Sequence, residues 1–207
     1  MTGLDDPNAA QSYVDANYGG ANSCMSADDR AATVMGHVNQ QLGALGVPEI
    51  GYDWGAGSNA GQFNFDTWRM GLGRDAFDPV HYESGGQAAE ADLLDTVYHE
   101  ARHSEQWFRM ARERAGLGAS AEQIVHVMGI PDWVAQHAVA YPILQCDASQ
   151  YEAEDWYQSV YGTGAAHRNT TLGDVQNHYE DYRNLPEEHD AWHAGGEVTQ
   201  DYLDHPR

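Results

Sequence analysis

The chain has 207 residues, of which 42% are hydrophobic, enough to bury one good core. Its formal net charge is −22, and all ten basic residues are Arg. Such a surface repels phosphate backbones and anionic lipid, which excludes binding to nucleic acid or to a membrane through general electrostatics.

The sequence carries no recognisable targeting segment. It has no apolar run of about 18 residues, and the segment after Met1 lacks the basic and apolar regions of a signal peptide. We therefore expect the protein either to stay in the cytoplasm or to leave the cell through a dedicated secretion apparatus. Cys24 and Cys146 match no metal-binding pair spacing, so they form either one disulfide or two buried thiols.

The first part of the chain predicts a lead-in, a helix and a strand. Residues 1–25 are rich in Asp, Asn, Gly and Ala, which is typical of a flexible lead-in or linker. An amphipathic helix is expected over residues 26–45, with Ser26 as its N-cap. Gly46-Val-Pro48 ends this helix, and residues 49–54 are a short strand candidate.

A second strand region is expected over residues 62–73, where side chains alternate in character. Phe63 and Phe65 would face one way, with Asn64 and Trp68 on the other face. A bend near Asp66-Thr67 would divide this region into two strands.

The longest helical pattern covers about residues 88–115. Small or apolar residues recur there at helical spacing: Leu94, Val97, Tyr98, Ala101, Phe108 and Ala111. Gly116 and Gly118 follow, as expected just beyond a helix C-terminus.

Three shorter helices are predicted downstream, over residues 120–128, 132–144 and 149–161. Residues 162–171 have the composition of a loop, and a last helical region begins at Thr171 or Asp174. The chain from 26 to 207 is therefore predicted to be one α+β domain, mostly helical, with a small N-terminal β-sheet.

The long helix contains His99-Glu100-x-x-His103, the short zinc motif HExxH. Residues four apart lie on nearly the same helix face, so both imidazoles can reach one metal ion. Glu100 lies beside that face, where it can hold a metal-bound water as general base. The alternative interpretation is a helix that carries two solvent-facing His.

A catalytic zinc site usually takes three protein ligands and leaves a fourth position for water. The candidates downstream of the motif are His126, His137, His167, His178, Glu187, Glu188, His189 and His193. Gln106 stands where the extended signature HExxHxxGxxH has its Gly, so that signature is absent. In the segment around Glu187 and Glu188, Pro186 precedes an acidic turn that opens a new helix. Acids favoured by the dipole of that helix are the alternative to a metal ligand.

Over about residues 63–195, the chain resembles the toxin-type metallopeptidase domains of bacterial polymorphic toxins and secreted effectors. The resemblance is carried by HExxH with a Gln shortly after it, and by the later Tyr182-Arg-x-Leu-Pro-x-Glu-x-Asp-Ala191. These domains are zincin-like proteins of the gluzincin kind, in which a Glu on a helix completes the zinc site.

The resemblance implies that His99 and His103 are Zn²⁺ ligands and that Glu100 is the base. Glu188 would be the third ligand, because it occupies the Glu of Pro-x-Glu-x-Asp-Ala, and Asp190 would orient an imidazole. Glu187, His189 and His193 remain alternative third ligands. The substrate would be a protein or peptide, and a secretion apparatus and an immunity protein would be partners.

In the expected mechanism, zinc lowers the pKa of its bound water and Glu100 takes the proton as the water attacks a peptide carbonyl. A Tyr or His would stabilise the oxyanion; the candidates are His167, His178, Tyr179 and Tyr182. The leading hypothesis is a zinc-dependent endopeptidase deployed as an exported effector or toxin. One alternative is a non-catalytic acidic binding protein or inhibitor with an incidental or structural zinc site. Another is a housekeeping peptidase.

Overall fold

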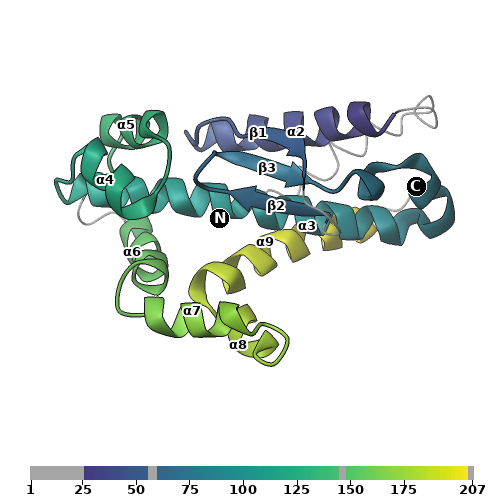
Figure 1. The fold of residues 1–207 in the computed structure, drawn as a ribbon. Helices are drawn as coiled ribbons and strands as arrows, with labels where there is room; N and C mark the ends of the chain where they lie inside the picture. Colours follow the sequence, from purple (N-terminus) through teal and green to yellow (C-terminus); the bar gives the residue numbers. More distant parts are fainter. Residues whose placement is uncertain (1–25, 56–59, 145–147, 205–207) are drawn as a thin grey trace. The chain divides into compact units, whose positions relative to one another are not determined.

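A computed structural model describes residues 26–55, 60–144 and 148–204. The described chain is mostly helical with one small sheet, which confirms the predicted α+β class (Figure 1). The predicted lead-in, residues 1–25, and both cysteines, Cys24 and Cys146, lie outside the described residues. None of the described helices combines the length and the apolar character that a membrane crossing requires.

The elements, in chain order, are α2 (Ala27–Ala44), β1 (Gly51–Trp54), β2 (Gly61–Asn64), β3 (Arg69–Leu72), the 3-10 helix η2 (Arg74–Phe77), α3 (Pro79–Gly116), α4 (Ala121–Met128), α5 (Asp132–Ala140), α6 (Ala148–Val160), α7 (Ala165–Gly173), α8 (Tyr179–Arg183) and α9 (Pro186–Asp204).

The chain divides into two compact units. The first contains α2, the sheet, η2, α3 up to Arg102 and α9 from His193 onward. The second contains the turn Phe65–Trp68 and the chain from His103 to Trp192. Whether residues 26–207 behave as one domain stays a prediction.

Helix α2 begins where the sequence predicts it. The Ser26 side chain accepts a hydrogen bond from Asp29 N, and the Asp29 side chain accepts one from Ser26 N, which completes a capping box. The Asn39 side chain donates to Ile50 O and accepts from Ile50 N, both at 2.9 Å. Helix α2 is thereby fastened to the segment that leads into β1.

The sheet has the order β1-β3-β2, with β1 parallel and β2 antiparallel to β3. The predicted division of residues 62–73 into two strands is therefore confirmed. The predicted faces are wrong at the turn: Trp68 is only 1% exposed, whereas Phe65 is 37% exposed. Trp68 has a φ of 57°, so the turn rotates its side chain away from the alternation of a regular strand.

In the first unit, β2 packs directly on α3. A Cβ atom at Gly61 would lie 3.4 Å from Thr96 Cγ2 and 3.6 Å from Glu100 Cγ. The helix turns Val97, Tyr98 and Ala101 into the core, where each is fully buried, in agreement with the predicted apolar stripe.

The motif helix α3 starts earlier than predicted, at Pro79, and ends at Gly116 as predicted. Helix α4 also agrees with prediction, with a capping box between Ser120 and Gln123. Helix α5 stops at Ala140, four residues short of the predicted end, because Tyr141 precedes Pro142 and a residue before proline disfavours helical geometry.

Two predictions in the C-terminal part are wrong. Residues 162–171 are not a loop, because α7 runs through Ala165–Gly173. Tertiary contacts favour this helix over its loop-like composition, since it buries Thr171 and brings Arg168 to Glu187. The last helical region begins at Tyr179, later than predicted, and α9 starts anew at Pro186, where proline is favourable.

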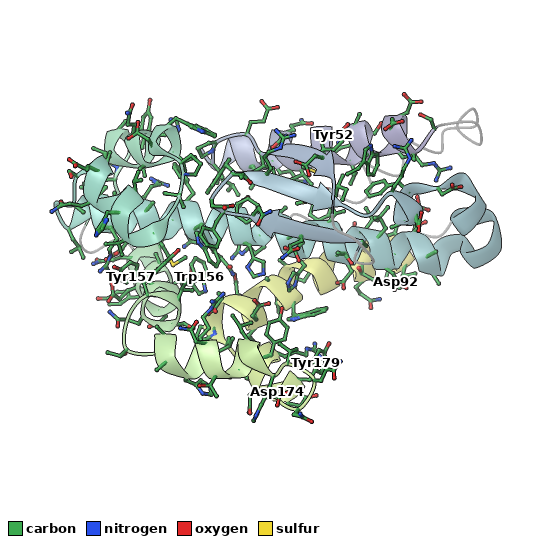
Figure 2. The ribbon with its side chains drawn as sticks, in the orientation of Figure 1. Tyr52, Asp92, Trp156, Tyr157, Asp174 and Tyr179 are labelled. Atoms are coloured by element: carbon green, nitrogen blue, oxygen red, sulfur yellow. The ribbon has the colours of Figure 1, made fainter. Side chains whose placement is uncertain are left out.

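Helix α6 supplies aromatic rings that cover arginines of α3 in the second unit. Trp156 and Tyr157, labelled in Figure 2, lie under the guanidinium carbons of Arg109 and Arg114, at 4.9 and 3.9 Å from the ring centroids. Each guanidinium also pairs with an acid of α6, Glu152 or Glu154. These arginines are thus engaged in the packing of the second unit.

Candidate metal centre

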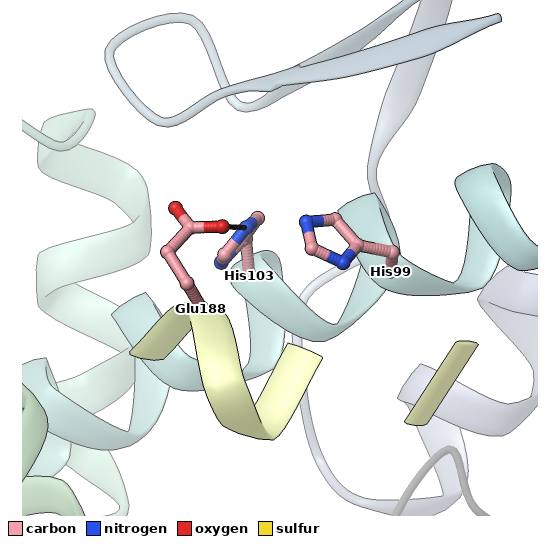
Figure 3. A group of neighbouring side chains, drawn as sticks. All are labelled: His99, His103 and Glu188. Atoms are coloured by element: carbon pink, nitrogen blue, oxygen red, sulfur yellow. Dashed lines mark ion pairs between the residues drawn. The ribbon is translucent and has the colours of Figure 1, made fainter. Parts of the chain in front are cut away.

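Helix α3 carries His99 and His103 one turn apart, so that their side chains leave the helix on the same side (Figure 3). Their exposed fractions are only 5% and 7%. The alternative interpretation of two solvent-facing His is therefore wrong. Two buried imidazoles on one helix face need polar partners or a metal ion.

Helix α9 brings Glu188 to this face of α3. Proline at position 186 starts the helix and Leu185 just before it is buried, so Glu188 falls in the first turn with an exposed fraction of 5%. Its Oε2 lies 3.6 Å from His103 Nε2, the contact that the dashed line in Figure 3 marks.

His99, His103 and Glu188 each offer one ligand atom, and these atoms all lie within 4.8 Å of one another. Two ligand atoms about 2.1 Å from a tetrahedral Zn²⁺ are about 3.4 Å apart, close to the separation of His103 and Glu188. Two imidazole nitrogens and one carboxylate oxygen are also a donor set that Zn²⁺ accepts at catalytic sites, with a fourth position open. The chemistry of the donor set therefore fits a zinc ion, and the His103–Glu188 separation is already close to the tetrahedral spacing, whereas the 4.8 Å limit for the whole group is wider.

Glu187, the alternative acidic ligand, is fully buried but has a different partner. Its Oε1 accepts a hydrogen bond of 2.6 Å from Arg168 Nε on α7. Glu187 thus forms an ion pair with α7, whereas its neighbour Glu188 belongs to the group of candidate metal ligands.

The histidines considered as third ligands lie elsewhere. Side chains at the six positions are exposed: His126, His137, His167, His178, His189 and His193. The structure thus brings together the two motif histidines and Glu188, and none of these six histidines is part of that group.

Glu100 is held by the sheet rather than by another side chain. Its Oε2 accepts a hydrogen bond of 2.7 Å from Phe63 N, a main-chain amide of β2. Among the described strands β2 lies at the edge of the sheet, so its outer amides face no other described strand. Glu100 takes one of them, which fixes the carboxylate next to the strand.

Gln106 connects the motif to α9, and its role was missed in the sequence. Its Oε1 lies 2.8 Å from His103 Nδ1, and its Nε2 donates to Glu187 O at 2.8 Å and to Asp190 Oδ2 at 2.6 Å. Asp190 is thus placed to act on His103 through Gln106. The only sequence signal was a Gln that follows the second motif His by three positions.

Aromatic rings border the same histidine. Trp107 packs edge-on against His103, with ring centroids 5.9 Å apart, and Phe65 stacks on Trp107 at 5.5 Å. The turn between β2 and β3 therefore contributes one ring of an aromatic pair beside His103.

The residues considered for oxyanion stabilisation show other contacts. His178 Nδ1 lies 3.1 Å from Asp181 Oδ2, and the rings of Tyr179 and Tyr182 lie 6.3 Å apart. These contacts do not single out an oxyanion-stabilising residue, so that assignment stays a prediction.

Comparison with protein-family models, with curated proteins and with solved structures found no match for this chain.

Proposed function

We propose that this protein is a zinc-dependent metallopeptidase of the zincin type. In this proposal His99, His103 and Glu188 hold the zinc ion, and Glu100 is the general base. The observation that carries the proposal is the convergence of three buried ligand atoms within 4.8 Å around an HExxH helix. Burial supports a functional interpretation, because buried imidazoles and carboxylates are costly unless they pair or bind a metal.

Zinc, when bound, lowers the pKa of water towards neutrality and polarises a carbonyl group. Glu100 then accepts the proton of the attacking water and passes it to the leaving amine. The hydrogen bond from Phe63 N holds one carboxylate oxygen of Glu100, which leaves the other oxygen for the water. This arrangement supports the role of base for Glu100.

The proposed substrate is a protein or peptide in extended conformation. The edge strand β2 lies against Glu100, and an extended peptide can add to the edge of a sheet through main-chain hydrogen bonds. The role of an exported bacterial effector or toxin, with a secretion apparatus and an immunity protein as partners, rests on the resemblance of the motifs alone.

Metal content per chain, measured by elemental analysis after incubation with zinc, tests the proposed centre. We expect about one zinc in the wild type and little in Glu188→Ala. Glu197→Ala is the matched control, because it removes another acid of α9 outside the group. Absence of zinc from the wild type would contradict the proposal and favour a non-catalytic acidic binding protein, to which the net charge of −22 is suited.

Cleavage of an unstructured protein such as casein, followed by mass spectrometry, tests the chemistry. Glu100→Gln should retain zinc while hydrolysis falls by about 10²- to 10⁴-fold, the usual contribution of a general base. Zinc binding with undiminished hydrolysis in this variant would rule out Glu100 as the base. Zinc binding without hydrolysis by the wild type would indicate a structural site.

A further inference from the structure

The buried side-chain amide of Gln106 contacts one group on α3, the imidazole of His103, and two groups on α9, the main-chain oxygen of Glu187 and the carboxylate of Asp190. It is 0% exposed and lies one turn beyond His103. Its Oε1 faces His103 Nδ1 at 2.8 Å, and its Nε2 lies 2.8 Å from Glu187 O and 2.6 Å from Asp190 Oδ2. All these residues belong to the second unit.

The partners on α9 determine which way this amide points. The main-chain oxygen of Glu187 can only accept a hydrogen bond, and the carboxylate of Asp190 also accepts. A reversed amide would place its oxygen against both of these acceptors. The nitrogen of Gln106 must therefore face α9, and its oxygen must face the imidazole.

The orientation of the amide in turn determines the tautomer of the imidazole. The Oε1 atom of Gln106 only accepts, so His103 Nδ1 must carry the proton. In the neutral ring, Nε2 then holds the lone pair. This is the atom that lies 3.6 Å from Glu188 Oε2, on the side of the candidate metal centre.

We propose that Gln106 is a positioning residue that sets the Nδ1–H tautomer of His103 through an amide relay from Glu187 O and Asp190. The relay makes Nε2 available as a ligand atom before any metal binds. Its benefit for zinc affinity rests on the proposed function, whereas the tautomer is a property of the metal-free chain. In a direct contact, a carboxylate would place its charge next to the imidazole. Here a neutral amide donates to the acceptors on α9 and accepts from His103, so no charge lies directly against the ring.

The test combines long-range ¹H–¹⁵N NMR of the His side chains with zinc affinity measured against a competing chelator. Spectra of the metal-free protein are recorded at about pH 8, where imidazoles are mostly neutral. Because the chain has eleven His, the spectrum of His103→Gln identifies the signals of His103. In the wild type we expect Nδ1 to be the protonated nitrogen and Nε2 the unprotonated one.

Gln106→Met removes the relay while keeping the length of the side chain. We expect His103 to become a mixture of tautomers and zinc affinity to fall by about 10- to 100-fold, the usual effect of losing a group that orients a ligand. Gln158→Met is the matched control, because Gln158 also joins an acid and a main-chain amide in the second unit, on α6. It should leave both the tautomer and the affinity unchanged.

A pair of substitutions at Asp190 provides a second test in case Gln106→Met is poorly folded. Asp190→Asn keeps an oxygen that accepts from Gln106 Nε2, so we expect it to retain the Nδ1–H tautomer and the zinc affinity of the wild type. Asp190→Leu removes this acceptor, and we expect it to weaken the preference for the Nδ1–H tautomer and to lower zinc affinity by up to about 10-fold. Equal spectra and affinities for the two variants would contradict the part of Asp190 in the relay.

The relay is overturned if wild-type His103 carries its proton on Nε2, or if Gln106→Met leaves the tautomer unchanged. It is also overturned if Gln106→Met and Gln158→Met lower zinc affinity equally. A wild type that binds no zinc but shows the Nδ1–H tautomer and its loss in Gln106→Met would support the relay while contradicting the proposed metallopeptidase. The two failures are therefore distinguishable.

Discussion

Helices α3 and α9 meet in both units, at a glycine in the first and around a buried amide in the second. In the first unit they approach closely at Gly195, where a Cβ atom would lie only 2.7 Å from Asp95 O. Polar contacts occur there too: Thr199 Oγ1 donates to Ala91 O at 3.3 Å, and the Tyr202 hydroxyl donates to the buried carboxylate of Glu90 at 2.5 Å. In the second unit the two helices are joined by polar side chains around Gln106.

The two contacts constrain the helices in different ways. Close packing at a glycine sets a distance between helices and depends on volume alone. A polar network also sets the direction of donors and acceptors, and it is costly when one member is lost. We therefore expect the contact at Gly195 to respond to a change of size and the contact at Gln106 to respond to a change of chemistry.

The largest effect is expected for Arg168→Leu in the second unit. Glu187 is 0% exposed, and its Oε2 has no hydrogen-bond partner within the described part of the chain. Removal of Arg168 would leave this buried carboxylate uncompensated and lower the free energy of unfolding by about 3 kcal/mol. Urea unfolding measures this loss. Arg183→Leu is the control: Arg183 is exposed over Trp192 and should contribute less than about 1 kcal/mol. Equal losses would contradict the structural importance of the buried pair.

The next largest loss of stability is expected when a larger residue replaces Gly195 in the first unit. Gly195→Ala forces a Cβ atom against Asp95, whose main-chain oxygen cannot move freely, so we expect a loss of about 1–3 kcal/mol in unfolding free energy. At the neighbouring Gly196 nothing lies within 4 Å of an added Cβ atom. Gly196→Ala should therefore stabilise the protein by about 0.5–1 kcal/mol through helix propensity. Thermal unfolding of both variants compares them, and a similar change in each would show that α3 and α9 are not closely packed there.

A smaller loss of stability is expected when the same kind of helix cap is removed in each unit. Ser26 and Ser120 each form a capping box, one in the first unit and one in the second. Ser26→Ala and Ser120→Ala should each cost about 1 kcal/mol. If residues 26–207 are one domain, both substitutions shift the same unfolding transition. Two transitions, each shifted by only one substitution, would contradict the single-domain prediction.

The smallest effect concerns acid stability in the first unit. Hydrogen bonds from Arg74 and Trp54 lower the pKa of Asp28 below its ordinary value of 3.8. A carboxyl group whose pKa is depressed on folding stabilises the protein above its unfolded pKa, and this contribution is lost as pH falls through the folded pKa. Asp28→Asn should therefore lower the unfolding temperature slightly near neutrality and show no difference from wild type at strongly acid pH. Asp155→Asn on α6 is an exposed control, and a pH-independent effect at Asp28 would contradict the ion-pair explanation.

Local sequence signals were sufficient for most helices and strands. Ser26, Ser120 and Pro186 mark helix starts because each acts within a single turn, through capping or a preset φ. The spacing of His99 and His103 likewise determines that both lie on one face of α3, since an α-helix has 3.6 residues per turn.

Other features depend on contacts between segments that are distant in sequence, and local sequence signals do not predict them. Glu187 and Glu188 are adjacent acids in the same helix turn, and only the position of Arg168 on α7 separates an ion pair from a candidate metal ligand. The same holds for α7 itself, whose composition favours a loop, and for Trp68, which the turn between β2 and β3 buries.

The class of fold and the motif helix could therefore be predicted from the sequence, because hydrophobic period, caps and proline act over a few residues. The resemblance also favoured Glu188 as the third ligand, but the ion pair that separates Glu187 from Glu188 and the partners of Gln106 are visible only in the tertiary structure. These depend on which faces of α3, α7 and α9 come together, and burial and hydrogen bonding between segments that are distant in sequence determine that arrangement.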